Sequence, residues 1–331
     1  MKLPSGNSVA DEMYMRRALQ LAAMGLGNVQ PNPMVGCVIV YQDRIIGEGF
    51  HQKYGEAHAE INAIASVKEP SLLQQATLYV NLEPCSHYGK TPPCAEALIR
   101  LQIPKVVIAC QDSNPQVAGK GIEMLQQAGI EVVLGVLEPE ARFLNRRFFT
   151  FMEQHRPYII LKWAQTLDGF MDIDRSSGNH DSYWITNEAL KFLSHRWRAQ
   201  ESAIAVGYRT VINDNPQLTT RLVSGKHPVR LIYDKDKTLP SNYHVFNDEA
   251  PTCRFSSLEE FKVLTFQHRL LSVIIEGGKK TLELFIRENL WDEARVLTGN
   301  SYFGKGLQAP QLGMIPQKVE HYGDNTVAFF Y

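Results

Sequence analysis

Four side chains in the first half of the sequence have the types and spacing of a catalytic zinc site. His58 and Glu60 stand two residues apart, and Cys85 and Cys94 lie further on, in a stretch rich in proline, glycine and serine. One imidazole and two thiolates are three ligands for zinc, which leaves a fourth position for water whose pKa the metal lowers towards about 7. Glu60 is then free to move protons between this water and a leaving amine. We predict one Zn²⁺ per chain, with Glu60 as the catalytic residue.

The spacing of these residues is close to the zinc-deaminase signature, in which H-x-E precedes P-C-x-x-C. Here the second cysteine, Cys94, follows Cys85 by nine residues. We expect the polar residues between them to form a loop that contacts the substrate. A structural zinc would need a fourth protein ligand, and His51 or His87 could serve, but neither explains Glu60.

The composition is that of a globular enzyme or binding protein. The chain has 331 residues, enough for two domains at roughly 100–200 residues each. Its formal net charge is -1, so no global field attracts nucleic acid or an anionic membrane. No run reaches the ~20 apolar residues of a membrane span, and the polar N-terminus lacks a signal-peptide core. The five cysteines are not a disulfide framework, and we expect a cytoplasmic protein.

The hydrophobic pattern of the first half predicts a β-hairpin followed by alternating helices and strands, which indicates a layered α/β domain. Arg156-Pro157 marks the expected boundary, giving domains of residues 1–154 and 155–331. The predicted helices cover residues 11–24, 60–67, 94–101, 121–128 and 138–154, and the predicted strands cover residues 34–41, 45–49, 77–82, 105–110 and 130–134. Cys37 and Cys110 fall in strands, where we expect small buried side chains.

The second half again alternates strands and helices. Gly277-Gly278 precedes a predicted helix, and glycines there let backbone N–H groups approach a phosphate, although two glycines alone are a weak signal. Residues 235–268 have little pattern. The predicted strands cover residues 158–163, 202–206, 229–233, 272–276, 295–298 and 326–331, and the predicted helices cover residues 187–198 and 281–288.

Several long motifs resemble one known family. Residues 31–40, 58–63, 81–94 and 114–121 are similar to the bifunctional riboflavin-biosynthesis deaminase/reductase family, and so are residues 162–169, 183–186, 210–221 and 276–281. The resemblance implies a cytidine-deaminase-like α/β/α domain followed by a dihydrofolate-reductase-like α/β domain that uses NADPH. The first would deaminate a diaminopyrimidinone that carries a ribosylamino 5′-phosphate. The second would reduce the ribosyl group of the product to a ribityl chain.

The resemblance also implies roles for individual residues. The deaminase substrate would contact Asn32, His51, His87, Lys90, Asp112 and Asn114. NADPH would contact Ala164, Trp184, Thr210, Asp214, Gly278, Lys279, Lys280, Thr281, Leu282, Glu283 and Leu284. The reductase substrate would contact Ser182, Arg198, Leu218, Arg221 and Glu276, with the two arginines as partners of the 5′-phosphate.

Details of the reductase half stay open at the level of sequence. Lys162 and Asp168 are polar groups near the expected reaction centre, but neither can be assigned as proton donor. The chain departs from the family pattern at Thr166, at Tyr208-Arg209 and at Thr220, which leaves the edges of the cofactor pocket uncertain.

Two other functions are compatible with parts of the pattern. A tRNA-type nucleic-acid deaminase with an appended RNA-binding domain is disfavoured by the near-neutral charge and by the lack of an aromatic and basic stripe. A structural zinc beside a working reductase is disfavoured by Glu60. We therefore expect pyrimidine nucleotides as partners, no nucleic acid or membrane, and a homo-oligomer.

Overall fold

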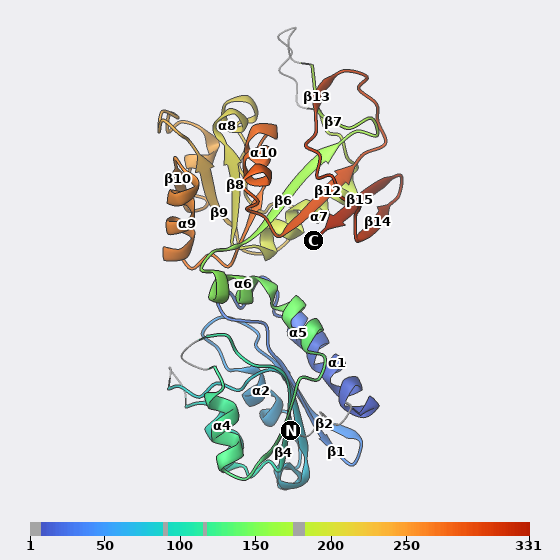
Figure 1. Cartoon of the computed structure of the whole chain (residues 1–331), viewed down its shortest axis with the longest axis vertical. Helices are drawn as coiled ribbons and strands as arrows, with labels where there is room; N and C mark the ends of the chain where they lie inside the picture. The colour runs from blue at the N-terminus through green and yellow to red at the C-terminus, as the bar shows by residue number, and fades with distance from the viewer. Residues whose placement is uncertain (1–7, 89–91, 115–117, 175–182) are drawn as a thin grey trace. The chain divides into compact units, whose positions relative to one another are not determined.

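The structure, a computed structural model, describes residues 8–88, 92–114, 118–174 and 183–331 (Figure 1). Lys90 and Ser182 lie outside these ranges. Contacts between residues divide the chain into two units, Met1–Gln154 and His155–Tyr331. Among the described residues, no helix has the length and apolar character needed to cross a membrane.

The first unit is built on a five-stranded sheet with the order β2-β1-β3-β4-β5. Strand β1 is antiparallel to β2 and β3, whereas β3, β4 and β5 run parallel to one another. The five strands are the predicted ones: β1 Gly36–Tyr41, β2 Arg44–Phe50, β3 Thr77–Leu82, β4 Lys105–Cys110 and β5 Glu131–Leu134. Cys37 and Cys110 are buried in this sheet, as predicted.

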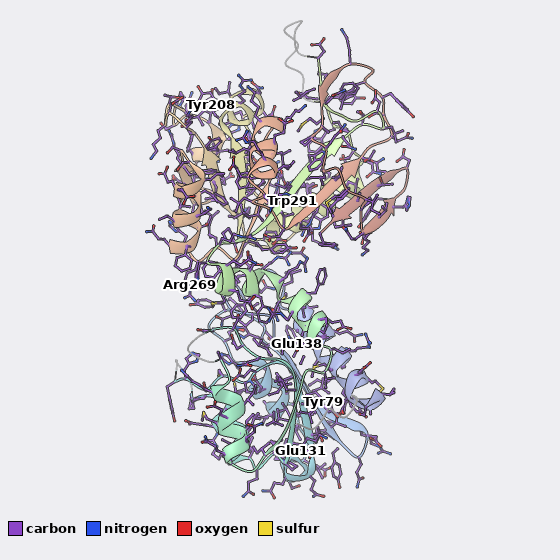
Figure 2. All side chains as sticks on the ribbon, in the orientation of Figure 1. Tyr79, Glu131, Glu138, Tyr208, Arg269 and Trp291 are labelled. Carbon is purple, nitrogen blue, oxygen red and sulfur yellow. The ribbon has the colours of Figure 1, made fainter. Side chains whose placement is uncertain are left out.

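Helices cover both faces of this sheet, so the unit is an α/β/α sandwich (Figure 1). On one face, Ala59, Ala95 and Leu125 of three helices pack against the strands. On the other, α1 lies against β1, and the Tyr79 hydroxyl, labelled in Figure 2, donates to Asp11 at 2.8 Å. The helices are α1 Val9–Ala23, α2 Ala59–Ala65, α3 Cys94–Arg100, α4 Lys120–Gln127, α5 Glu138–Leu144 and α6 Arg146–Gln154, with a 3₁₀ turn at Pro70–Gln75.

The prediction of one continuous helix over residues 138–154 is wrong, because the chain breaks at Asn145 between α5 and α6. The buried Asn145 amide bonds both backbone groups of Met34: Oδ1 accepts from the N–H at 2.8 Å and Nδ2 donates to the carbonyl at 2.8 Å. Asn81 also donates to the Met34 carbonyl, at 3.0 Å. The interruption therefore fixes the segment that follows Asn32 and Pro33.

The second unit contains an eight-stranded sheet with the order β10-β9-β8-β11-β6-β12-β15-β14. The strands from β10 to β12 are parallel, and β15 and β14 add an antiparallel edge. A separate ribbon pairs β7 with β13. The strands are β6 Tyr158–Gln165, β7 Phe170–Ile173, β8 Ala203–Gly207, β9 Val229–Tyr233, β10 Thr252–Phe255, β11 Ser272–Ile275, β12 Glu293–Thr298, β13 Gly306–Gln308, β14 Lys318–Tyr322 and β15 Asn325–Phe330.

Helices cover both faces of this sheet as well. Phe261 of α9 and Phe285 of α10 pack on one face, and Trp197 of α7 and Val211 of α8 pack on the other. The helices are α7 Glu188–Gln200, α8 Tyr208–Asp214, α9 Leu258–Gln267 and α10 Lys279–Arg287, with a 3₁₀ turn at His244–Phe246. The sequence pattern missed β7, β10, β13, β14, α8 and α9, and two of these fall in the weakly patterned residues 235–268.

Candidate active sites

His58, Cys85 and Cys94 form a triangle of possible metal ligands in the first unit. Their ligand atoms all lie within 4.8 Å of one another, and His58 Nδ1 is 3.5 Å from Cys85 Sγ and 3.4 Å from Cys94 Sγ. A nitrogen and a sulfur bound tetrahedrally to one zinc, with bonds of about 2.0 and 2.3 Å, are about 3.5 Å apart. The donor set and its spacing therefore fit zinc.

The local fold brings these ligands together at two helix starts. His58 is the N-cap of α2 in an extended conformation, and Cys94 is the first residue of α3. The Cys94 N–H donates to Cys85 Sγ at 3.2 Å, and the Ala95 N–H donates to the Cys85 carbonyl at 3.2 Å. These amides hold the loop that begins at Cys85 against the start of α3, and they favour a thiolate at Cys85.

Glu60 lies in the first turn of α2 and is 3 % exposed. Burial, and secondarily the charge of Cys85, raises the pKa of Glu60 to about 7. The pKa of Cys85 is lowered to about 4, chiefly by a hydrogen bond from the Cys94 thiol. The pKa of Cys94 is raised by the same hydrogen bond, by burial and by the repulsion of the nearby negative charges of Glu60 and Cys85. A divalent cation removes this repulsion, since it binds both sulfurs as thiolates. The electrostatics therefore agree with the distances in favouring a metal.

Asn32 and His51 lie next to the metal ligands. The buried His51 ring contacts the His58 ring edge-on, with 5.6 Å between centroids. His51 Nδ1 bonds the Ala57 carbonyl at 3.0 Å, so it carries the proton, and Nε2 accepts from Asn32 Nδ2 at 3.2 Å. Burial lowers the pKa of His51, which keeps the ring neutral.

Asp112 and Asn114 lie on the loop that follows β4. The Asn114 N–H donates to Asp112 Oδ1 at 2.7 Å. Burial raises the pKa of Asp112 to about 6, and the nearby His87, which is exposed, partly offsets that rise. His87 is therefore close enough to Asp112 for its charge to act on that carboxyl group.

Glu83 is a residue of this region that the sequence did not single out. It is buried, and its carboxylate accepts four backbone N–H groups: Oε1 from Gly121 and Ile122 at 2.9 and 3.3 Å, and Oε2 from Asp112 and Gly119 at 3.2 and 3.0 Å. Glu83 directly precedes Pro84 and Cys85, so it connects the metal-binding segment to the loop of Asp112. A carboxylate before Pro-Cys was visible in the sequence, but its four partners are distant along the chain.

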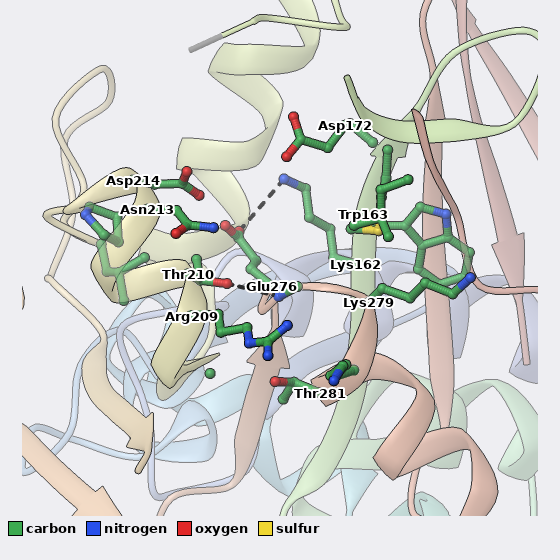
Figure 3. A pocket seen from close by; sticks show the side chains of 18 of the residues that line it. Lys162, Trp163, Asp172, Arg209, Thr210, Asn213, Asp214, Glu276, Lys279 and Thr281 are labelled. Carbon is green, nitrogen blue, oxygen red and sulfur yellow. Dashed lines mark hydrogen bonds and ion pairs between the residues drawn. The ribbon is translucent and has the colours of Figure 1, made fainter. Parts of the chain in front are cut away.

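The second unit has a cavity of about 1670 Å³ at the carboxyl ends of its parallel strands (Figure 3). Open α/β sheets bind ligands at this edge. Of the predicted reductase residues, those that line the cavity are Ala164, Trp184, Thr210, Asp214, Gly278, Lys279, Lys280, Thr281 and Glu283 for the cofactor, and Arg198, Leu218, Arg221 and Glu276 for the substrate.

Three of the predicted positions that the structure describes are not part of the cavity lining. Leu282 is fully buried in the hydrophobic core, because it faces the sheet from α10, and Leu284 is not part of the lining. Asp168 instead holds a turn, in which its carboxylate accepts from Thr166 Oγ1 at 2.5 Å and from the Gly304 N–H at 2.7 Å. Ser182 lies outside the described residues, as does Lys90 of the first unit.

The start of α10 has the form of a phosphate-binding site. The Gly278 N–H donates to Thr210 Oγ1 at 2.9 Å, which holds the start of α10 close to α8. A Cβ on Gly277 would lie 2.7 Å from the Gly207 nitrogen, so only glycine lets β8 and the end of β11 approach this closely. Lys279 and Lys280 follow at the positive end of the helix. These residues fit the phosphates of a nicotinamide dinucleotide.

Glu276 joins two cations at the base of the cavity. It accepts from Arg198 at 2.7 Å, and its other oxygen is 3.8 Å from Lys162 Nζ, the ion pair drawn in Figure 3. Burial alone would raise the pKa of Glu276, but the two cations attract the carboxylate more strongly and lower it to about 2. Burial lowers the pKa of Lys162. Arg198 therefore donates from two of its nitrogens to Glu276, which leaves fewer of its N–H groups to bind a phosphate.

Comparison with known proteins assigns both halves of the chain. Residues 8–110 match the cytidine and deoxycytidylate deaminase zinc-binding region, and residues 157–327 match the RibD C-terminal domain. The chain is 40% identical to riboflavin biosynthesis protein RibD of Aquifex aeolicus, over 97% of this chain and 98% of that protein. It is 41% identical to RibD of Bacillus amyloliquefaciens, over 91% of this chain and 87% of that protein.

Solved structures give the same result. A Thermotoga maritima diaminohydroxyphosphoribosylaminopyrimidine deaminase/5-amino-6-(5-phosphoribosylamino)uracil reductase has a TM-score of 0.87 and 37% identity, with 97% of this chain and 98% of that chain covered. RibD of Acinetobacter baumannii has a TM-score of 0.87 and 34% identity, with the same coverage. With its zinc-ligand triangle in the first unit and its cavity in the second, the chain belongs to the RibD family of riboflavin biosynthesis proteins.

Proposed function

We propose that the chain catalyses two consecutive steps of riboflavin biosynthesis. Residues 1–154 hydrolytically deaminate 2,5-diamino-6-(5-phosphoribosylamino)pyrimidin-4(3H)-one. Residues 155–331 then use NADPH to reduce the ribosyl group of the product to 5-amino-6-(5-phosphoribitylamino)uracil. The observation that carries the proposal is the triangle of His58, Cys85 and Cys94 beside the buried Glu60, in a chain whose second unit has its own large cavity.

In the deamination, the protein holds the pyrimidine and moves protons. Zinc, when bound to His58, Cys85 and Cys94, supplies a Lewis acid that lowers the pKa of water. Glu60, buried in the first turn of α2 beside the metal ligands, is placed to take up a proton from water and to give it to the leaving amine.

Substrate recognition in the first unit rests on polar groups on two sides of the metal triangle. Asn32 and His51 contact the substrate from the side of His58, and Asp112 and Asn114 from the loop after β4. His87 and Lys90, in the segment between the two cysteines, complete the contacts.

In the reduction, the second unit orients two ligands with respect to each other. The start of α10 and its two lysines hold the cofactor phosphates. Arg198, Arg221 and Glu276 line the same cavity. We infer that the substrate binds towards them, with sugar C1′ in its open imine-like form next to the nicotinamide. Positioning of the hydride donor and acceptor is the main contribution of the protein.

A nucleic-acid deaminase is not favoured, because the second half matches the RibD C-terminal domain. We also propose a cytoplasmic location, which suits the use of NADPH and the free cysteines. A homo-oligomer is supported by large exposed apolar side chains of the second unit outside the cavity, Tyr302 and Ile315 among them. Size-exclusion chromatography with light scattering measures the mass of the full-length protein in solution. A mass equal to that of one chain would contradict the homo-oligomer.

The deciding experiment supplies the diaminopyrimidinone phosphate to the full-length protein with and without NADPH. We expect ammonia release in both cases and NADPH consumption only after deamination. Ammonia release from RNA, with none from the free nucleotide, would contradict the proposal.

A further inference from the structure

His195 is a cavity residue to which neither the motifs nor the family resemblance gave a role. It lies in α7, is 3 % exposed, and lines the cavity of the second unit. Its Nδ1 accepts from the Arg221 N–H at 3.1 Å. Because a backbone N–H can only donate, Nδ1 carries no proton, and the ring proton of neutral His195 is on Nε2.

The other ring nitrogen is available to a ligand. Among the residues that the structure describes, no hydrogen-bond acceptor is found for His195 Nε2. Nε2 is also not one of the fully buried polar atoms that lack a partner, so it keeps some exposed surface. Since the residue lines the cavity, the Nε2–H faces ligand space.

The charges around His195 keep it neutral and make its surroundings attractive to an anion. Arg198 of α7, Arg221, Lys162 of β6 and Glu276 after β11 all act on the ring. Burial, followed by the two arginines, lowers the pKa of His195 to about 4. Three cations face a single carboxylate here, so positive charge is in excess.

The segment that carries Arg221 is held by side chains, outside any strand. Arg230 Nη1 donates to the Gln217 carbonyl at 3.3 Å, and the Thr220 N–H donates to His227 Nδ1 at 3.1 Å. The contact with His195 is the next one along the chain, at Arg221 itself. It connects this segment to α7, the helix that carries Arg198.

We propose that His195 acts through both ring nitrogens on the reductase substrate: Nδ1 fixes the backbone of Arg221, and Nε2–H donates to an oxygen of the substrate phosphate. The inference rests on the proposed reductase function, and it makes His195 a binding and positioning residue. A neutral donor suits this place, because protonation of Nδ1 would break the contact with Arg221.

Two substitutions separate the two nitrogens. In His195→Asn the amide oxygen can take the place of Nδ1, so the Arg221 contact survives and the Nε2–H is lost. In His195→Gln the amide N–H₂ can take the place of Nε2–H, and the acceptor for Arg221 is lost. His268→Asn, on an exposed histidine of the same unit, is the matched control.

For His195→Asn we expect the KM for the deaminated substrate of the second unit to rise about tenfold or more, the loss of one hydrogen bond to a charged group. The KM and the directly titrated Kd for NADPH should be unchanged, as should ammonia release by the first unit of the same chain. For His195→Gln we expect a smaller rise in the substrate KM together with a lower kcat, because Arg221 is misplaced.

An unchanged substrate KM in His195→Asn would overturn the donor role, and unchanged kinetics in His195→Gln would overturn the positioning role. Nitrogen-15 NMR of the histidine rings tests the tautomer without any substrate: an Nε2–H signal that disappears in His195→Asn is expected, and an Nδ1–H tautomer refutes the inference. If wild-type protein does not reduce the substrate at all, the proposed function fails instead, and the NMR result still stands.

Discussion

Arg198 donates to both carboxylate oxygens of Glu276, from Nη2 to Oε2 at 2.7 Å and from Nε to Oε1 at 3.4 Å. The pair joins α7 to the end of β11, and Lys162 approaches the same carboxylate from β6. All three side chains are largely buried. Removing the carboxylate therefore leaves two cations in a poorly solvated place, which is much more costly than losing an exposed ion pair.

We expect Glu276→Gln to destabilise the second unit in a pH-dependent way. The folded pKa of Glu276, about 2, lies below the ordinary value of 4.5, so its contribution is fully present above about pH 4.5 and is lost as the pH falls through 2. The shift in pKa corresponds to a contribution by Glu276 to the free energy of unfolding on the order of 3 kcal/mol. All four tryptophans lie beyond residue 155, so tryptophan fluorescence during urea unfolding reports on this unit.

The difference between wild type and Glu276→Gln should be large at pH 7 and small near pH 2. Glu259→Gln, which removes an exposed i,i+3 pair with Lys262, should leave the free energy of unfolding nearly unchanged. An unfolding difference that stays constant from pH 7 to pH 2 would refute the assignment of this pH dependence to Glu276.

We expect Glu60→Gln to abolish deamination while zinc is retained. The amide has the size of the carboxylate but cannot carry protons, and lost general acid–base catalysis costs typically 10²–10⁴-fold in kcat. Metal analysis and ammonia release measure the two properties, and reduction of the deaminated intermediate should stay at the wild-type rate. Glu56→Gln, on a nearby exposed residue, is the control. Full deaminase activity in Glu60→Gln would exclude the proton-transfer role.

Cys85→Ala should lower the zinc content and abolish deamination, because His58 and Cys94 alone would bind zinc weakly. Reduction of the deaminated intermediate should remain measurable, since the cavity of the second unit is lined by its own residues. A chelator should act on the wild type in the same way. Cys253→Ala, in β10, should change neither activity. Loss of both activities in a folded Cys85→Ala protein would contradict independent sites.

The zinc site was predictable because its residues form short local motifs. His58 is the N-cap of one helix and Glu60 lies in its first turn, and Cys85 and Cys94 bracket one loop, so the type and spacing of the residues were enough. The five strands of the first sheet were predictable for a similar reason, because their apolar runs end at clear turns. His195 could not be found in this way, since its partner Arg221 is brought to it only by the tertiary fold.

The missed elements differ in how much signal they had. Ser257 is the N-cap of helix α9, and its hydroxyl accepts from the Glu260 N–H at 3.1 Å. The pattern S-x-x-E, which is typical of a helix start, was present in the sequence. The break at Asn145 had no such signal. An apolar pattern spaced at three and four residues continues across it, and the hydrogen bonds of its amide to Met34 outweigh the continuity of the helix.

We expect Glu83→Gln to weaken substrate binding by the first unit. Each oxygen of Glu83 accepts two backbone N–H groups, and glutamine offers a single oxygen, so its N–H₂ must face two donors in either orientation. Unpaired buried donors cost about 1–3 kcal/mol, which should appear as a lower melting temperature of this unit. Because Asp112 lies on the loop that is released, the KM for the diaminopyrimidinone phosphate should rise more than kcat falls. Reduction by the second unit should be unaffected.

Glu123→Gln, an exposed change on α4, is the matched control for Glu83→Gln and should leave both the KM and the melting temperature at wild-type values. The zinc content of Glu83→Gln decides how the carboxylate acts. Retained zinc with a raised KM means that Glu83 positions the loop of Asp112, because the metal triangle is then intact. If Glu83→Gln loses zinc while the fraction of protein that retains zinc has an unchanged KM, Glu83 supports Cys85 through Pro84. That result would refute the role of Glu83 in holding the substrate loop.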